Sequence, residues 1–131
     1  MRMKPALTSA DVHKIMEACR AEASKNKWNV TIAIVDDGGA LLQLARMDGA
    51  SPTTAEVATG KARSAAATRR PTKMMEDRIK ERVALLAMPN IPVQGGVPIL
   101  HQNECVGAIG VSGVQSHEDE QVANAGVAAI S

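Results

Sequence analysis

The sequence is almost without aromatic side chains: its 131 residues include one tryptophan, Trp28, and neither phenylalanine nor tyrosine. Proteins that bind single-stranded nucleic acid without sequence preference stack the bases on aromatic side chains, and aromatic cages hold ammonium groups. The composition therefore disfavours both kinds of site. Hydrophobic residues still make up 45% of the chain, which is enough for a single globular domain over residues 1–131 with a core of alanine and aliphatic side chains.

The chain also lacks an excess of charge of one sign. Its net charge is +1, whereas a nucleic-acid-binding domain typically carries a strongly basic surface. The charges are nevertheless unevenly distributed, because residues 1–82 carry +5 and residues 83–131 carry −4. Three explanations are open: two solvated faces, the contact of opposite faces in a homo-oligomer, or the attraction of an anionic ligand to the basic half.

Paired cysteines and long apolar segments are missing as well. Cys19 and Cys105 form no CxxC motif and have no spacing typical of zinc ligands. The first twelve residues contain no apolar segment typical of a secretion signal, and no run is long enough for a transmembrane helix. We therefore expect a soluble cytoplasmic protein with two reduced thiols, no membrane contact and no nucleic-acid partner.

The hydrophobic pattern predicts helices and strands in the order α-ββ-αα-ββ-α. A period of 3.6 residues indicates a helix, and apolar β-branched runs joined by turn residues indicate a hairpin. The expected elements are a helix over 9–24, strands over 30–35 and 40–47, helices over 52–68 and 72–86, strands over 97–100 and 105–112, and a last helix capped by Ser116. We therefore predict an α+β fold in which helices flank an antiparallel sheet of two hairpins.

Two of the expected helices differ in the size of the side chains on one face. The helix over 52–68 carries a nearly smooth stripe that lets another backbone approach closely, formed by Val57, Ala58, Lys61, Ala62 and Ala65. This stripe favours either close packing or a contact between subunits. The helix over 72–86 carries larger side chains that we expect to point inward, namely Met75, Ile79, Val83 and Leu86.

Motifs of nucleotide-binding loops, zinc proteases and serine hydrolases are absent. Two short stretches can instead hold an anion. Gly95 and Gly96 precede a proline-bearing strand, and their amides either bind a carboxylate or form a simple loop-to-strand turn. Arg46 and Asp48 flank a tight turn before the next helix. There Arg46 and the helix amides either bind an anion, or Arg46 pairs with Asp48.

The three histidines differ in their surroundings. His101 lies in or beside a hairpin turn, where it is either solvated or the acid or base of a site. His13 lies beside the apolar face of the first helix, and it is either a half-buried packing residue or an axial ligand of haem, with Cys105 as the second ligand. His117 follows the Ser116 cap and is expected to be exposed.

Several stretches in the right order resemble a known protein family. They are Ile34–Gly39 (IVDDGG), Ala45–Ala50 (ARMDGA), Val57–Ala58 with Lys61–Ala62, Gly95–Ile99 (GGVPI), Val106–Gly113 (VGAIGVSG), and Asp119–Glu120 before Val122–Ala123 and Ala125–Gly126. Together they cover nearly the whole chain and resemble the GlcG/HbpS-like family, which includes the C-terminal domain of PduO-type corrinoid adenosyltransferases.

The resemblance implies an antiparallel sheet flanked by helices, similar to profilin and to sensor-type domains, and assembly into homo-oligomers. It also implies binding of haem or a link to haem degradation in some members, and a place in corrinoid metabolism or small-acid catabolism in others. Asn103–Glu104 stands where the family usually carries an Asp-Gly or Asn-Gly turn, so we expect that hairpin to be reshaped. We expect neither ATP nor cobalamin chemistry in this chain.

These observations leave three hypotheses for the function. The first is a cytoplasmic protein that binds a small anionic metabolite or haem, using Arg46, Asp48, Gly95, Gly96 and His101, with His13 and Cys105 as the haem ligands. The second is a tautomerase, deaminase or hydrolase of a small carboxylate, in which Arg46 and the Gly95–Gly96 amides hold the anion and His101 or Asp48 transfers protons. The third is an interaction module that acts as an oligomer. We favour a binding function, because the sequence shows no recognisable set of catalytic residues.

Overall fold

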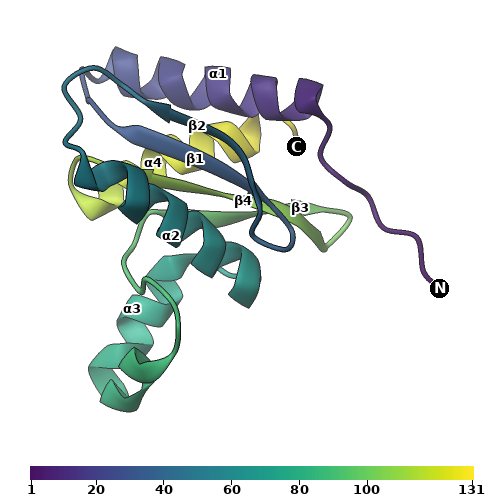
Figure 1. Ribbon diagram of the computed structural model, residues 1–131, viewed down its shortest axis with the longest axis vertical. Helices are drawn as coiled ribbons and strands as arrows, with labels where there is room; N and C mark the ends of the chain where they lie inside the picture. Colours follow the sequence, from purple (N-terminus) through teal and green to yellow (C-terminus); the bar gives the residue numbers. More distant parts are fainter.

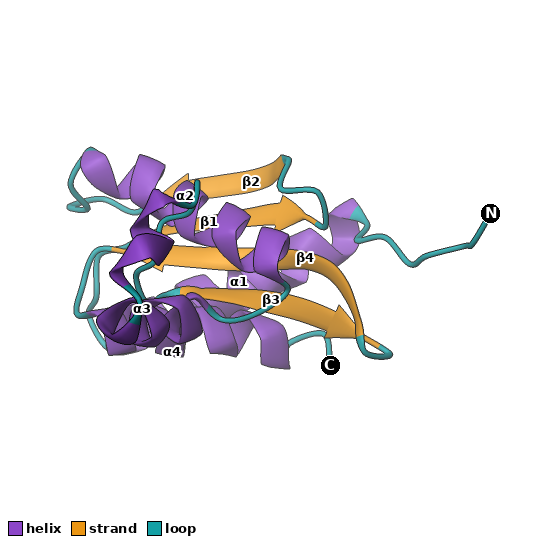
Figure 2. Cartoon of the chain, turned by 90° about the horizontal axis from the view of Figure 1, so that it is seen from below, coloured by secondary structure: helices purple, strands orange, loops and turns teal.

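The computed structural model describes residues 1–131 and contains one four-stranded sheet with helices on both faces. The elements in chain order are α1 (Ser9–Lys25), β1 (Thr31–Asp36), β2 (Leu41–Arg46), α2 (Thr53–Thr68), α3 (Thr72–Glu81), the 3-10 helix η1 (Val83–Ala87), β3 (Gly96–His101), β4 (Glu104–Ser112) and α4 (Ser116–Ala128). The strands lie in the order β2-β1-β4-β3 (Figure 2), and every neighbouring pair is antiparallel. The predicted fold is therefore confirmed, with both hairpins joined through β1 and β4.

Helices α1 and α4 lie side by side on one face of the sheet, and α2 covers the other face (Figure 1). The core under α1 and α4 is aliphatic and includes Ile15, Met16, Ile32 and Ile109. The core under α2 is smaller and consists almost entirely of alanine; its members are Ala33, Val35, Ala58, Ala62, Ala65, Ala66 and Ala108. Because the side chains of this core are small and none is aromatic, α2 packs close to the sheet.

The contact between α2 and β4 leaves no room for a side chain on the strand. A Cβ atom at Gly110 would lie 2.0 Å from the carbonyl oxygen of Ala58 and 2.5 Å from the amide nitrogen of Ala62. The predicted close approach of another backbone is thus confirmed, and that backbone belongs to the chain's own sheet. Four members of the stripe, Ala58, Lys61, Ala62 and Ala65, are buried there, so the stripe does not supply the contact between subunits that we considered.

The region after α2 differs from its prediction. The expected helix over 72–86 ends at Glu81, because Arg82 leaves the helical conformation, with φ of −131° and ψ of 86°, and η1 follows it. Val83 and Leu86, which we expected to point inward, are 68% and 59% exposed. The physical reason is that α2 already covers this face of the sheet, so α3 projects away from it (Figure 1) and only Thr72 of that helix is buried.

The β3–β4 turn is tight despite its unusual sequence. Gln102 and Asn103 both adopt left-handed backbone angles, with φ of 52° and 65°, as a two-residue hairpin turn of this kind requires. A bulge between Ile99 and Leu100 shifts the strand register. Beyond that shift, Leu100 pairs with Cys105 and His101 pairs with Glu104. β3 therefore ends at His101, one residue beyond the expected end.

Cys19 and Cys105 are both buried and unpaired, in agreement with reduced thiols. Burial raises the pKa of the Cys19 thiol to about 12. None of the helices combines the length and the hydrophobicity that crossing a membrane requires.

Candidate functional site

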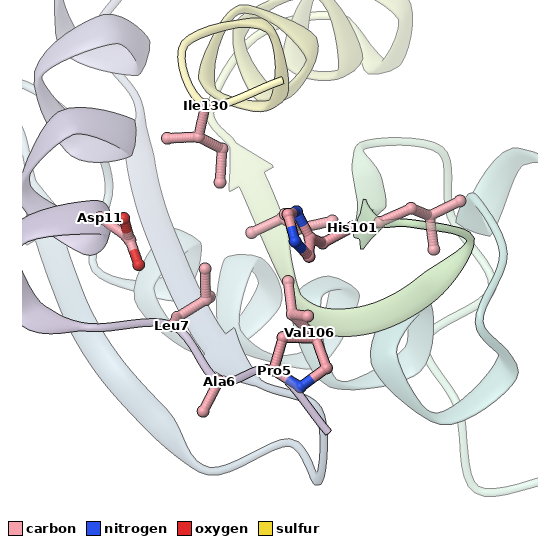
Figure 3. A pocket seen from close by; sticks show the side chains of 9 residues that line it. Pro5, Ala6, Leu7, Asp11, His101, Val106 and Ile130 are labelled. Atoms are coloured by element: carbon pink, nitrogen blue, oxygen red, sulfur yellow. The ribbon is translucent and has the colours of Figure 1, made fainter. Parts of the chain in front are cut away.

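A pocket of about 210 Å³ lies between the N-terminal segment, the start of α1, the end of β3 and the C-terminus (Figure 3). Its walls are mainly apolar and are formed by Pro5, Ala6, Leu7, Ile99, Leu100, Val106 and Ile130. Two ionisable side chains complete the lining, Asp11 from α1 and His101 from β3. Sequence reasoning identified His101 as a candidate, whereas it treated Asp11 only as an acid at a helix start.

Asp11 is fixed in place by the cap of α1. Its Oδ2 accepts a hydrogen bond from the Thr8 amide at 2.9 Å, and its own amide donates to Thr8 Oγ1 at 3.2 Å. This reciprocal pair is a capping box, which satisfies two amides that the helix leaves unpaired. The hydrogen bond from the Thr8 amide lowers the pKa of Asp11, and His101 adds a smaller electrostatic contribution in the same direction. The pocket therefore contains a fixed negative charge at neutral pH.

The N-terminal segment forms one wall of the pocket and is attached at both hairpins. Lys4 Nζ lies 2.6 Å from Asp37 Oδ2 in the β1–β2 turn, and Arg2 pairs with Glu104 at the start of β4. Leu7 packs against the main core. Exposed ion pairs contribute little to stability and weaken with salt. The segment before Leu7 is thus attached to the two hairpins mainly by exposed ion pairs.

The predicted anion-binding residues Arg46 and Asp48 lie elsewhere. Arg46 is the last residue of β2, Asp48 follows that strand, and both side chains are exposed. No salt bridge joins them. The Gly96 amide donates to Thr72 Oγ1 at 2.9 Å, and the Gly95 carbonyl accepts from Val111 at 3.0 Å. The Gly96 amide is therefore already hydrogen-bonded to a side chain of this protein. This agrees with the alternative of a simple loop-to-strand turn.

The structure does not bring the five predicted ligand-binding residues together. Arg46 in β2 pairs with Thr31 of β1, and Gly96 in β3 pairs with Gly110 of β4. Since β2 and β3 are the two edge strands, three strand spacings, or roughly 14 Å, separate their backbones. His101 lies at the opposite end of β3. Of the predicted set, only His101 lines the Asp11 pocket. The arrangement suggested for an enzyme is consequently not assembled within one chain.

The two candidate haem ligands lie on different faces of the sheet. His13 is exposed on α1, so the alternative that it is a half-buried packing residue was wrong. Cys105 is buried, its Sγ donates to the Gly107 carbonyl oxygen, and Arg69 Nη1 lies 3.8 Å from that sulfur at the end of α2. Since α1 and α2 cover opposite faces, these side chains do not ligate one iron within one chain. The residues present therefore do not fit the haem site that the sequence suggested.

A buried ion pair joins α2 to α4, and sequence reasoning did not identify it. Lys61 Nζ lies 3.1 Å from Asp119 Oδ2 and 3.0 Å from the Val111 carbonyl oxygen, and both charged side chains are 3% exposed. The Val114 amide donates to Asp119 Oδ1 at 3.1 Å. Burial raises the pKa of Asp119, although Lys61 opposes that shift. A lysine within the alanine stripe was the available signal, because a buried lysine needs a partner.

Comparison with known proteins gives consistent results over almost the whole chain. The model of the family described as "Haem degrading protein HbpS-like" matches residues 7–128. Protein GlcG of Escherichia coli strain K12 is 41% identical over 114 residues, which cover 86% of this chain and 85% of GlcG.

Solved structures share the fold. A double mutant of HbpS from Streptomyces reticuli has a TM-score of 0.92 and 31% identity, covering 100% of this chain and 91% of that chain. The crystal structure of a PduOC:haem complex has a TM-score of 0.88 and 25% identity, covering 95% of each chain. The family match, the identity to GlcG and these structures agree with the resemblance found in the sequence. The chain therefore belongs to the HbpS-like family.

Proposed function

We propose that this protein binds a small organic ligand, in the cytoplasm, at the pocket between Asp11 and His101. The observation that carries the proposal is the combination of apolar walls with two ionisable side chains from different elements. Such a combination is typical of ligand sites, in which apolar surface supplies affinity and a few polar groups fix orientation. The HbpS-like family and the haem complex of PduOC support a binding function.

The chemistry of the pocket favours a compact ligand with two different polar groups. Its volume of about 210 Å³ is below the range of roughly 300–1,000 Å³ typical of sites for drug-sized molecules. Asp11 accepts hydrogen bonds, so it favours a hydroxyl or amino group of the ligand. His101 can donate to a carboxylate. A small hydroxy or amino acid satisfies both residues, in line with the small anionic metabolite that we expected.

We expect the substitution His101→Ala to weaken the binding of such an acid by about tenfold, the effect of losing one hydrogen bond to a charged group. Isothermal titration of short hydroxy acids, chosen by a thermal-shift survey, measures this change. His117→Ala is the matched control, since His117 is exposed on α4 and lines none of the pockets. Equal affinities of the two variants would show that the ligand binds elsewhere.

Haem is a second candidate ligand, because the PduOC neighbour is a haem complex. In a single chain, His13 is exposed whereas Cys105 is buried. We therefore expect a Soret band shift on titration with hemin to disappear in His13→Ala and to remain in Cys105→Ala. A titration without any Soret shift in the wild-type protein would remove haem from consideration.

We also propose that the protein forms a homo-oligomer. Leu41 and Leu42 are 46% and 43% exposed on β2, and the outer edge of that strand has no partner in the sheet. Exposed apolar edge strands readily pair with another chain. Light scattering at several protein concentrations should show an assembly that Leu42→Lys shifts toward the monomer. A monomeric wild-type protein at every concentration would contradict the proposal.

A further inference from the structure

A second pocket, on the other side of the sheet from Asp11 and His101, combines methionines with arginines. It has a volume of about 230 Å³ and lies where α3 turns back through η1. Pro71, Met74, Met75, Leu85 and Met88 form its apolar lining. Thr68, Arg70 and Arg78 contribute the polar atoms, and no acidic residue lines it. Methionine side chains adapt to ligands of irregular shape, because they are unbranched and flexible.

The two arginines of this pocket have no anionic partner. Neither guanidinium takes part in a salt bridge or in a side-chain hydrogen bond, and two of the three acids of α3, Glu76 and Asp77, are engaged by other groups. The third acid, Glu81, is the last residue of α3 and lies outside the lining of the pocket. Lys73 and Lys80 lie 2.8 Å and 3.5 Å from Asp77, and Glu76 accepts from the Gln94 amide at 3.2 Å. Arg70 and Arg78 therefore offer unused donors beside an apolar surface.

The surrounding sequence strengthens the positive potential. Residues 69–82 contain six basic and three acidic side chains, and residues 83–103 contain no acidic side chain at all. The carboxylate of an approaching molecule is thus attracted to this pocket and meets no repelling charge on its lining. An arginine fork also matches the geometry of a carboxylate.

We propose that this pocket binds a medium-chain carboxylate, that is, an acyl chain with one anionic end. The carboxylate accepts hydrogen bonds from Arg70 and Arg78, and the chain lies over Met74, Met75 and Leu85. Complementary charge at one end and apolar contact along the rest distinguish this ligand from the compact polar acid proposed for the Asp11–His101 pocket. The two sites lie on opposite sides of the sheet, so each can be tested without the other.

Octanoate and its uncharged counterpart, 1-octanol, are suitable probes for isothermal titration with the full chain. Octanoate is expected to bind at least about tenfold more tightly than 1-octanol, because charge-assisted hydrogen bonds to arginine exist only for the acid. Arg78→Gln is expected to weaken octanoate binding by about tenfold. Arg82→Gln, which removes the same charge just after α3 but outside the lining, should leave the affinity unchanged, as should His101→Ala.

Three results would overturn the proposal. The first is the absence of saturable heat with octanoate. The second is an equal loss of affinity in Arg78→Gln and Arg82→Gln, which would indicate general attraction by positive charge. The third is a wild-type assembly that Arg78→Gln dissociates without any effect on octanoate binding, since the surface would then be a contact between subunits. Circular dichroism of each variant confirms that the comparison is made between folded proteins.

Discussion

Replacing Lys61 with methionine is expected to lower the free energy of unfolding by about 3–5 kcal/mol, the usual cost of removing one partner from a buried ion pair. The ammonium group holds two acceptors, Asp119 and the Val111 carbonyl, in a region where both charged side chains are 3% exposed. Without Lys61, the Asp119 carboxylate is left with the Val114 amide as its hydrogen-bond donor. Urea denaturation of both proteins at pH 7 measures the difference.

The same substitution should also change the pH dependence of stability. Burial raises the pKa of Asp119 above its ordinary value of 3.8, and removal of Lys61 takes away an interaction that opposes this shift. A carboxyl group with a raised pKa in the folded state binds protons more tightly there than in the unfolded chain. Stability therefore falls as the pH rises above the unfolded value. The Lys61→Met variant should accordingly recover stability as the pH is lowered toward 4.

Two further variants control this result. Lys73→Met removes an exposed ion pair with Asp77 and should cost less than about 1 kcal/mol. Lys61→Met combined with Asp119→Leu replaces both charges with apolar side chains and should restore most of the loss, because no unpaired charge is left buried. A loss in Lys61→Met no greater than that in Lys73→Met would contradict the buried position of the pair.

Substitution of Gly110 by alanine is the second change with a large expected effect, a loss of about 3 kcal/mol. Its Cβ atom would lie 2.0 Å from the Ala58 carbonyl oxygen, so the α2 backbone must move away from β4. That movement loosens the alanine core beneath α2 as a whole. Thermal unfolding of the purified variant measures the effect.

Gly38→Ala is the matched control for this prediction. A Cβ atom there would meet only Asp36 Oδ1, at 3.6 Å, and the residue has no left-handed backbone angle. We expect a change of less than about 0.5 kcal/mol, as at most surface positions. If Gly110→Ala unfolds at the same temperature as Gly38→Ala, the close packing of α2 on β4 is refuted.

Local patterns in the sequence were sufficient for the element order and for most of the core. Apolar β-branched runs joined by turn residues identified the strands, and the stripe on α2 correctly indicated a close backbone contact. The failure at Val83 and Leu86 has a physical cause: helical periodicity describes an apolar face but does not say whether a core is available to cover it. Here α2 already occupies that face of the sheet, and α3 is left outside.

Local sequence patterns predicted only part of the candidate site. His101 was recognised as a residue type suited to a site, but its neighbour Asp11 is ninety residues away and seemed to serve only a helix start. The register of β3 and the path of the N-terminal segment bring them to one pocket. Arg46 and Gly96 were grouped because each suits an anion, and the sheet order β2-β1-β4-β3 separates them. Long-range pairing of strands, which no local pattern encodes, decided all these outcomes.

Mapping by nuclear magnetic resonance determines whether the pocket between Asp11 and His101 is the ligand site. Amide spectra of the isotopically labelled protein are recorded during titration with short hydroxy acids. We predict that shift changes concentrate in residues 5–11, 99–106 and around Ile130. His101→Ala should move the midpoint of the titration to an about tenfold higher ligand concentration, whereas His117→Ala should leave it unchanged. Saturable changes located instead around Arg46, Asp48 and Gly95–Gly96, unaffected by His101→Ala, would show that the ligand does not bind between Asp11 and His101.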